Sequence, residues 1–362
     1  MEKKRLGDIC EIVTGATPKT NIKEFWDGDI NWITPAELTE DTYIINESLR
    51  KITTEGVEKT GLKSFPKGTV ILSSRAPIGK VAIAGCEMYC NQGFKNLVCS
   101  KQINNRFLYW YLKGHKEYLN SLGRGATFKE ISKAIVENIE ICLPTLEKQE
   151  KYADILEQCN GIIQIKKGQL RKLDTLVKSR FVELFGDPVI NSRGWKKALI
   201  GDDCFVTKLA GFEYTQYINY EDSGDVVMVK AQNVKNGKLN RKELSFISNE
   251  VSDSLPRSQL APGDVVMTYV GANIGDVAII DNEYKYHLAP NVAKIRPDSE
   301  RYNSIYFMYM LMLLNAYIVK NSADTAKAAL GMERIRKLNV FVPPMELQNQ
   351  FADFVTSIDK LK

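Results

Sequence analysis

Histidine is almost absent from this chain of 362 residues, which contains only His115 and His287. Because the two lie at unrelated places, a histidine-based metal site and a Ser–His or Cys–His nucleophile are both disfavoured. The seven cysteines are scattered. The one close pair, Cys86 and Cys90, has no second pair at metal spacing, so we expect reduced cytoplasmic thiols. No apolar run is long enough to cross a membrane, and Met1–Arg5 does not lead into the apolar core of a signal peptide.

Catalytic motifs are missing as well. No Gly-x-x-x-x-Gly-Lys-Ser/Thr phosphate loop occurs, no Gly-x-Gly-x-x-Gly follows a strand, and there is no Asp-Pro-Pro-Tyr-type methyltransferase motif. A duplicated enzyme would usually carry its catalytic motif twice, and nothing catalytic repeats here. We therefore expect a non-catalytic chain without a metal or cofactor of its own.

The sequence does contain an internal repeat. The segment Pro-Thr-Leu-Glu-Lys-Gln-Glu-Lys-Tyr-Ala-Asp at 144–154 returns at 343–353 as Pro-Pro-Met-Glu-Leu-Gln-Asn-Gln-Phe-Ala-Asp, at an offset of 199. Earlier, Ile78-Gly-Lys-Val-Ala-Ile83 matches Ile274-Gly-Asp-Val-Ala-Ile279. Because such matches keep their order along the chain, it consists of two diverged copies of one module.

Each copy shows the same succession of patterns. Its first half is rich in β-branched residues broken by Gly and Pro turns, which predicts short strands of a mixed sheet or partial barrel. A short aromatic helix follows at 107–112 and at 305–314, and then a proline and another helix. Tyr109, Trp110 and Tyr111 could stack on bases or pack against the sheet. The expected fold class is α+β.

Residues 146–185 contain no proline and only two glycines. Apolar residues recur there every three or four positions and form one stripe, which predicts a helix of roughly 60 Å. Its basic residues are either a solvated face or a face toward DNA or an acidic partner. They are Lys166, Lys167, Arg171, Lys172, Lys178 and Arg180.

The second helix has only residues 345–362, roughly 27 Å if fully helical. The two helices are expected to pack as an antiparallel coiled coil that leaves half of the first stripe uncovered. A partner subunit or a second copy of the chain would complete it. The expected parts are a domain at 1–144, a long helix at 145–186, a linker at 187–194, a domain at 195–343 and a short helix at 344–362.

The strings Leu143–Gln149, Val342–Gln348 and Arg180–Pro188 carry a family resemblance. With their order and repetition, the whole chain resembles the specificity (S) subunit of bacterial type I restriction–modification enzymes, with a shortened second conserved helix. The resemblance implies a non-catalytic, cytoplasmic DNA-binding subunit. Two target recognition domains would each read half of a bipartite, asymmetric site in double-stranded DNA, and the helices would set the spacer.

The same resemblance implies partners. The helices would bind two methyltransferase (M) subunits, which hold S-adenosylmethionine, and restriction (R) subunits that use ATP and Mg²⁺ would join them; no membrane is involved. Two alternatives remain open. One is the specificity subunit of a related system with fused methylase and nuclease, and the other is a coiled-coil scaffold that does not bind DNA.

Polar and basic residues on the loops between strands are the candidates for DNA contact, because base edges are read by Arg, Lys, Asn and Gln while phosphates accept any donor. The net charge of +5 fits such a local basic surface. In the first copy the candidates are Arg75, Asn91, Gln92, Lys95, Arg124, Thr127 and Lys129. In the second copy they are Lys230, Gln232, Asn233, Tyr269, Asn273, Asn291, Lys294 and Lys327.

Overall fold

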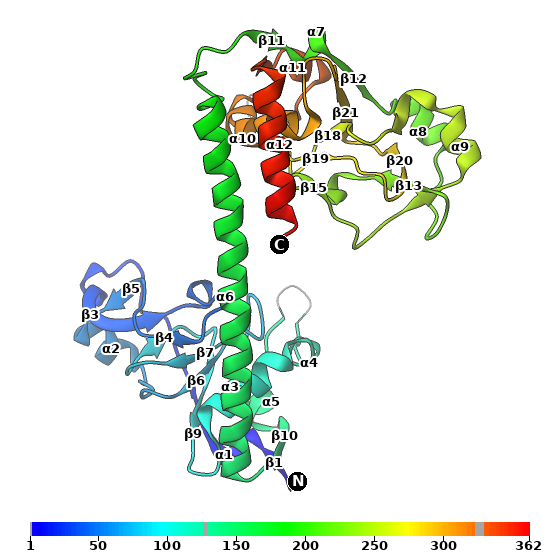
Figure 1. Cartoon of the computed structure of the whole chain (residues 1–362). Coiled ribbons are helices and arrows are strands. Elements are labelled where there is room, and N and C mark those ends of the chain that lie inside the picture. Colours follow the sequence, from blue (N-terminus) through cyan, green and yellow to red (C-terminus); the bar gives the residue numbers. More distant parts are fainter. Residues whose placement is uncertain (1, 126–128, 323–328) are drawn as a thin grey trace. The chain divides into compact units, whose positions relative to one another are not determined.

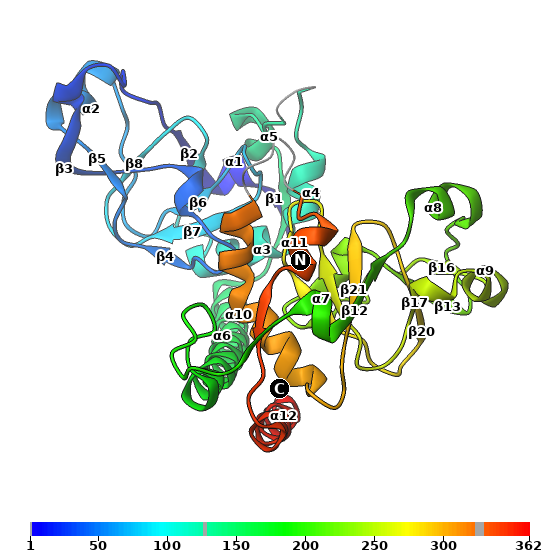
Figure 2. The same cartoon turned by 90° about the horizontal axis from the view of Figure 1, so that it is seen from above.

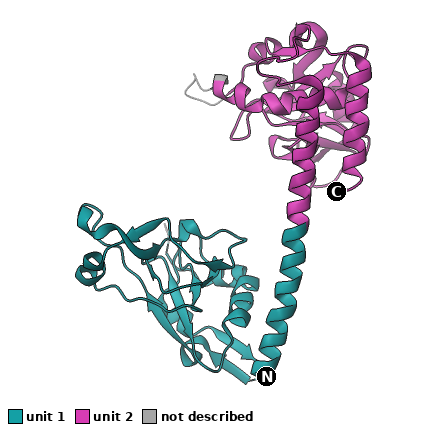
Figure 3. Cartoon of the chain, turned by 60° about the vertical axis from the view of Figure 1, so that its left-hand side comes forward, with its two compact units in different colours: residues 1–165 teal, residues 166–362 magenta. Residues whose placement is uncertain are grey.

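The computed structural model describes residues 2–125, 129–322 and 329–362 (Figure 1). The chain forms two compact units, residues 1–165 and residues 166–362 (Figure 3). The long helix predicted from the sequence is present as α6 (Leu146–Phe185), and the two units divide inside it. The domain limits expected at 144 and 195 therefore stay predictions.

The first unit is built on two sheets. A five-stranded sheet has the order β2-β9-β6-β7-β4, with only β4 parallel to its neighbour, and a smaller sheet has the order β5-β3-β8. The strands are β1 (Glu2–Arg5), β2 (Cys10–Thr14), β3 (Trp26–Ile33), β4 (Ile44–Ile45), β5 (Arg50–Ile52), β6 (Val70–Leu72), β7 (Val81–Ala84), β8 (Tyr89–Cys90), β9 (Lys95–Cys99) and β10 (Glu140–Leu143). The helices are α1 (Leu6–Ile9), α2 (Thr54–Thr60), α3 (Asn105–Gly114), α4 (Lys116–Ser121) and α5 (Lys133–Glu137).

The predicted aromatic helix is α3, and it begins where Asn104 caps it. The Oδ1 atom of Asn104 accepts the backbone N–H groups of Arg106 and Phe107 at 2.9 and 3.2 Å. Tyr109 is fully buried in the core beneath the sheet, and Trp110 packs against the same core. For these aromatic residues the structure therefore supports core packing and not base stacking.

The second unit repeats this plan with two four-stranded sheets, β12-β21-β18-β19 and β16-β13-β20-β17, and a short β14-β15 pair. Its strands are β11 (Lys197–Leu199), β12 (Cys204–Lys208), β13 (Val226–Val229), β14 (Val234–Lys235), β15 (Lys238–Leu239), β16 (Phe246–Ile247), β17 (Gln259–Leu260), β18 (Val265–Thr268), β19 (Val277–Ile279), β20 (Lys285–Leu288), β21 (Val292–Pro297) and β22 (Asn339–Phe341). Its helices are α7 (Ile200–Asp203), α8 (Gly211–Tyr217), α9 (Asn249–Ser254), α10 (Ser304–Ser322), α11 (Met332–Arg336) and α12 (Met345–Asp359).

Helix α10 is the centre of the core of the second unit. It packs against β19 of the sheet on one side and against the helices α6 and α12 on another, and Figure 2 shows α10 beside these two helices. The Tyr306 ring stacks on Phe181 of α6 with ring centroids 5.6 Å apart, and Tyr309 meets Phe351 of α12 edge-on at 5.3 Å. One hydrophobic cluster therefore joins the sheet to both helices.

Helix α12 lies beside the C-terminal half of α6 in the antiparallel direction (Figure 3). Phe351 packs against Phe181 at 5.3 Å, whereas Lys362, eleven positions further on, forms an ion pair at 2.7 Å with Asp174, which precedes Phe181 on α6. The antiparallel helix pair and the α+β class predicted from the sequence are thus confirmed.

In each unit the first strand pairs antiparallel with the last. Strand β1 pairs with β10 from Glu2↔Leu143 to Arg5↔Glu140, and β11 pairs with β22 from Lys197↔Phe341 to Leu199↔Asn339. The chain therefore enters and leaves each domain through neighbouring strands. Within the described residues, no helix is both long and apolar enough to cross a membrane.

Candidate nucleic-acid interface

In the first unit, Glu130 joins three of the candidate loops. Its Oε1 atom lies 3.1 Å from Lys95 Nζ and its Oε2 atom 3.8 Å from Arg75 Nη1, while its backbone exchanges two 3.0 Å hydrogen bonds with Arg124. Arg75 and Lys129 also line one cavity of about 520 Å³. Sequence reasoning missed Glu130, because one carboxylate in a charged loop carries no signal of the lysine 35 positions away that it binds.

The candidate side chains of this unit differ in how exposed they are to solvent. Arg124, Lys129 and Gln92 are exposed, and Gln92 accepts a hydrogen bond of 2.6 Å from Thr17. Asn91 is half-buried and closes a turn, because its Oδ1 accepts the Gly93 N–H at 2.8 Å. The Lys95 side chain is only 8% exposed and its Nζ donates to Ser74 Oγ and Glu130. The position of Lys95 therefore does not fit its predicted role as a DNA contact. Its ammonium group instead links Ser74 and Glu130 inside the unit.

In the second unit the corresponding loops meet at Tyr269. Its backbone N–H donates to the Asn291 carbonyl at 2.9 Å, and its carbonyl accepts the Leu330 N–H at 2.8 Å. Tyr269 is half-buried, which raises the pKa of its hydroxyl, and Lys208 Nζ lies 5.5 Å from its ring centre. Asn273 and Asn291 are exposed beside it, and Asn291 has φ of 70°. Three candidates are thus brought to one place.

Two other candidates of the second copy are buried and already hydrogen-bonded inside the unit. Lys294 is 2% exposed and donates to the Gln259 carbonyl at 2.7 Å; burial lowers the pKa of its ammonium group. Asn233 is 3% exposed and its Nδ2 donates to the carbonyls of Asn240 and Glu243. The predicted base contacts at these two positions do not fit such burial, since both side chains already satisfy internal groups.

Lys230 and Gln232 stand between these extremes. Lys230 is half-buried with Nζ 2.9 Å from Ser245 Oγ, whereas Gln232 is exposed and donates to Glu243 at 3.1 Å. Thr127 and Lys327 lie outside the described residues.

The same two backbone bonds gather the loops in both units. In the first unit the Ser74 N–H donates to the Gly93 carbonyl at 2.8 Å and the Ile131 N–H to the Ser74 carbonyl at 3.0 Å. Ser74 thus occupies the place of Tyr269, and the frame is common while the side chains on it differ. Such an arrangement can present two different sets of donors to two different ligand surfaces.

Helix α6 presents a second surface. Its stripe is buried at Val177, Phe181 and Phe185, where α12 covers it. N-terminal to Val177, nine large apolar residues of α6 are more than 40% exposed: Leu146, Tyr152, Ile155, Leu156, Ile162, Ile163, Ile165, Leu170 and Leu176. The half-covered stripe predicted from the length of the second helix is therefore present in this chain.

Comparison with known proteins gives one consistent family. The model of the type I restriction modification DNA specificity domain matches twice, at residues 1–175 and 193–362. The chain is 30% identical to the type I restriction enzyme MjaIX specificity subunit of Methanocaldococcus jannaschii, over 97% of this chain and 85% of the relative. It is 22% identical to the EcoBI specificity subunit of Escherichia coli, over 80% and 67%.

Solved structures show the same fold. The S subunit of a type I restriction–modification system from M. genitalium superposes with a TM-score of 0.54 at 13% identity, covering 99% of this chain and 89% of that one. A chain from a type I restriction–modification complex gives 0.51 at 16% identity, covering 100% and 91%. At these identities the likeness concerns the fold alone.

Proposed function

The chain belongs to the type I restriction–modification DNA specificity family, and on that basis we propose that each of its two domains reads one half of a bipartite, asymmetric sequence in double-stranded DNA. The observation that carries the proposal is the common loop frame with different side chains. Ser74 and Tyr269 occupy the same place in their units and make the same backbone bonds. Like frames can dock on DNA alike, while unlike side chains select different bases.

The first half-site would be contacted by the loops that carry Arg75, Arg124 and Lys129. The second would be contacted by the loops that carry Tyr269, Asn273 and Asn291. Arginine and asparagine offer paired donors and acceptors to guanine and adenine edges, and lysine suits phosphates. Exposed Gln92 and Gln232 are further candidates, whereas Lys95, Asn233 and Lys294 hold the frame.

Helix α6 would serve two further purposes. It runs unbroken from one unit into the other, so an insertion of one helical turn should lengthen the spacer between the half-sites. Its uncovered stripe would bind methyltransferase subunits, two per complex, or a second copy of this chain. S-adenosylmethionine would be held by the methyltransferase subunits, and ATP with Mg²⁺ by restriction subunits, so chemistry resides in the partners.

Methylome sequencing of the host with and without this gene tests the proposal. The expected result is loss of a bipartite methylated adenine motif in the deletion strain and its return on complementation. An unchanged methylome would contradict the proposal and favour a scaffold that does not bind DNA.

A further inference from the structure

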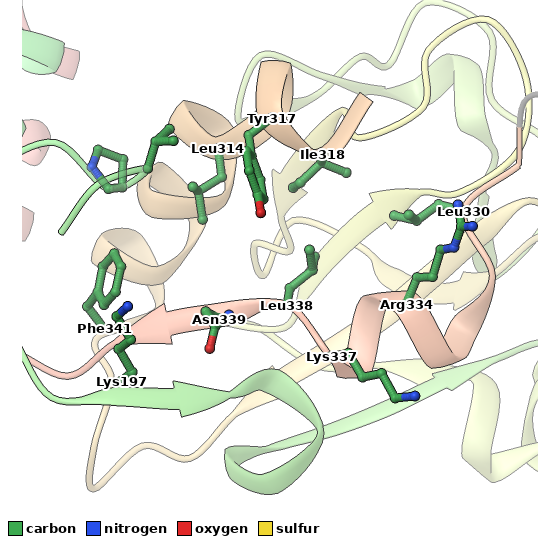
Figure 4. A pocket seen from close by; sticks show the side chains of 12 residues that line it. Lys197, Leu314, Tyr317, Ile318, Leu330, Arg334, Lys337, Leu338, Asn339 and Phe341 are labelled. Atoms are coloured by element: carbon green, nitrogen blue, oxygen red, sulfur yellow. The ribbon is translucent and has the colours of Figure 1, made fainter. Parts of the chain in front are cut away.

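A cavity of about 490 Å³ lies in the second unit, next to the gathered loops, since it is lined by Leu330, whose backbone N–H donates to the Tyr269 carbonyl. Figure 4 shows Leu314, Tyr317 and Ile318 of α10 on one side and Leu338 and Phe341, at β22, on the other. Leu314, Ile318 and Phe341 are buried, so the wall of the cavity is part of the core surface. A cavity of this size accommodates bulky apolar side chains.

Among the described residues that line this cavity, the charged ones are all cations. They are Lys197, Arg334 and Lys337, and all three are exposed. Within the described part of the chain, neither Lys197 nor Lys337 has a carboxylate within 4.0 Å, and the nearby Glu333 pairs with Arg336. The cavity is therefore apolar inside and cationic at its opening.

The first unit has a cavity of about 480 Å³ at the same place. At the offset of 199, its Tyr118 and Ile139 correspond to Tyr317 and Leu338 of the second cavity. The hollow is thus a property of the module. The charged residues differ, because Ile135 and Asn138 stand where the second cavity has Arg334 and Lys337, and the charged residues that line the first cavity are Arg124 and Glu130.

A third cation differs between the units in its surroundings. Lys3 corresponds to Lys197, since it lies opposite Cys142 as Lys197 lies opposite Phe341. Lys3 lies 3.8 Å from Glu140, whereas Asn339 occupies the corresponding position in the second unit. In the second unit an uncharged amide therefore replaces the carboxylate that lies beside Lys3 in the first unit.

We propose that the cavity beside β22 is a docking site for an acidic peptide segment of a partner protein. A bulky apolar side chain of the segment enters between Leu314, Ile318 and Leu338, and its carboxylates meet Lys197 and Lys337. Burial of the apolar side chain stabilises the complex, and the charges provide selectivity. A DNA backbone suits this site less well, because it carries no bulky apolar group that would fill the apolar interior.

The test uses the full chain and a phage-displayed library of random peptides. Selection is performed on the wild type, with counter-selection on the K197E/K337E variant. We expect the selected peptides to combine acidic residues with a Leu, Phe or Trp, and the consensus peptide, labelled with a fluorophore, to bind with a Kd below about 1 mM. The variant K196E/K242E, which has the same net charge but leaves the cavity intact, is the matched control.

Fluorescence anisotropy of the labelled peptide then separates the contribution of the two lysines from that of the apolar wall. K197E/K337E should weaken the consensus peptide by about tenfold, which corresponds to 1.4 kcal/mol. Y317A removes an apolar wall residue that is 49% exposed and should weaken it several-fold, while the control variant binds as the wild type does.

Each of three other results overturns the proposal. One is that every peptide that binds the wild type also binds K197E/K337E. Another is a random-sequence DNA duplex that loses affinity with K197E/K337E while no peptide does. The last is concentration-dependent dimerisation of the chain that only K197E/K337E abolishes, since the occupant would then be a second copy.

Discussion

Gln149 and Gln348 are both fully buried and make the same three hydrogen bonds at the starts of α6 and α12. Gln149 accepts the Asn104 N–H at 2.8 Å and donates to the carbonyls of Pro144 and Gln102 at 2.9 and 3.2 Å. Gln348 accepts the Asn303 N–H at 2.9 Å and donates to the carbonyls of Pro343 and Arg301 at 2.8 and 2.9 Å. One glutamine in each module thus fixes the start of α6 or α12 to the asparagine that caps α3 or α10, respectively.

Removal of this glutamine should destabilise the unit that contains it. We expect Gln149→Ala to lower the free energy of unfolding by about 2–4 kcal/mol, because three buried backbone groups lose their partner. Urea unfolding followed by circular dichroism measures the change. Gln102→Ala removes an exposed amide from a neighbouring loop and should change stability by less than about 0.5 kcal/mol. Equal losses in both variants would contradict the structural role.

Arg75 and Arg124 should matter for one half-site only. Each alanine substitution is expected to reduce affinity of the assembled complex for cognate DNA by about tenfold, within the 1–3 kcal/mol typical of a base contact. Competition with duplexes mutated in one half at a time locates the loss. Unchanged affinity in both variants would remove these loops from the interface.

Substitution of Lys95 should weaken DNA binding by disturbing the loops of the first unit, without changing which bases are preferred. In Lys95→Met the carboxylate of Glu130 loses its 3.1 Å partner, and the loops of the first unit lose their tie. We expect lower affinity for every tested sequence without a change in rank order. A variant that binds as tightly as the wild type but prefers different bases would show that Lys95 does read DNA.

The second unit should lose stability in mild acid. Burial lowers the pKa of His287, with its ring nitrogens 3.0 and 3.4 Å from the carbonyls of Leu288 and Leu255. The unfolded chain therefore takes up a proton below the ordinary histidine pKa of about 6.5, before the folded chain does, so stability falls as the pH drops through that window. In His287→Gln, the urea midpoint of unfolding at pH 5.5 should come close to the midpoint at pH 7.5. In the control His115→Gln, which changes an exposed histidine, the two midpoints should stay apart as in the wild type. Identical pH dependence in all three proteins would exclude His287 as the cause.

The uncovered stripe of α6 should be needed for assembly but not for folding. Ile163→Glu changes a side chain that is 51% exposed, so the unfolding midpoint should stay within experimental error of the wild type. Co-purification of the methyltransferase subunit, or self-association of the chain, should be lost. Gln169→Glu, at an exposed polar position of the same helix, serves as control and should assemble normally.

The helices and the repeat could be predicted from sequence because their signals are local. The stripe that begins at Tyr152 and the absence of proline placed α6 within one residue of its observed ends. The loops could not be sorted in this way. Lys95 and Lys129 look alike in sequence, yet one is buried by Glu130 and the other is exposed. Lys294 likewise is buried in β21 against Gln259, a contact between strands that no local pattern encodes.

The pairing of β1 with β10 and of β11 with β22 has a consequence for how such proteins change over generations. Because each domain begins and ends on adjacent strands, recombination between these strands would exchange all of its surface loops at once. The junction with the following helix, with its buried glutamine, would remain the same. A new sequence preference could therefore be inherited as a single genetic unit, without adjustment of the rest of the chain.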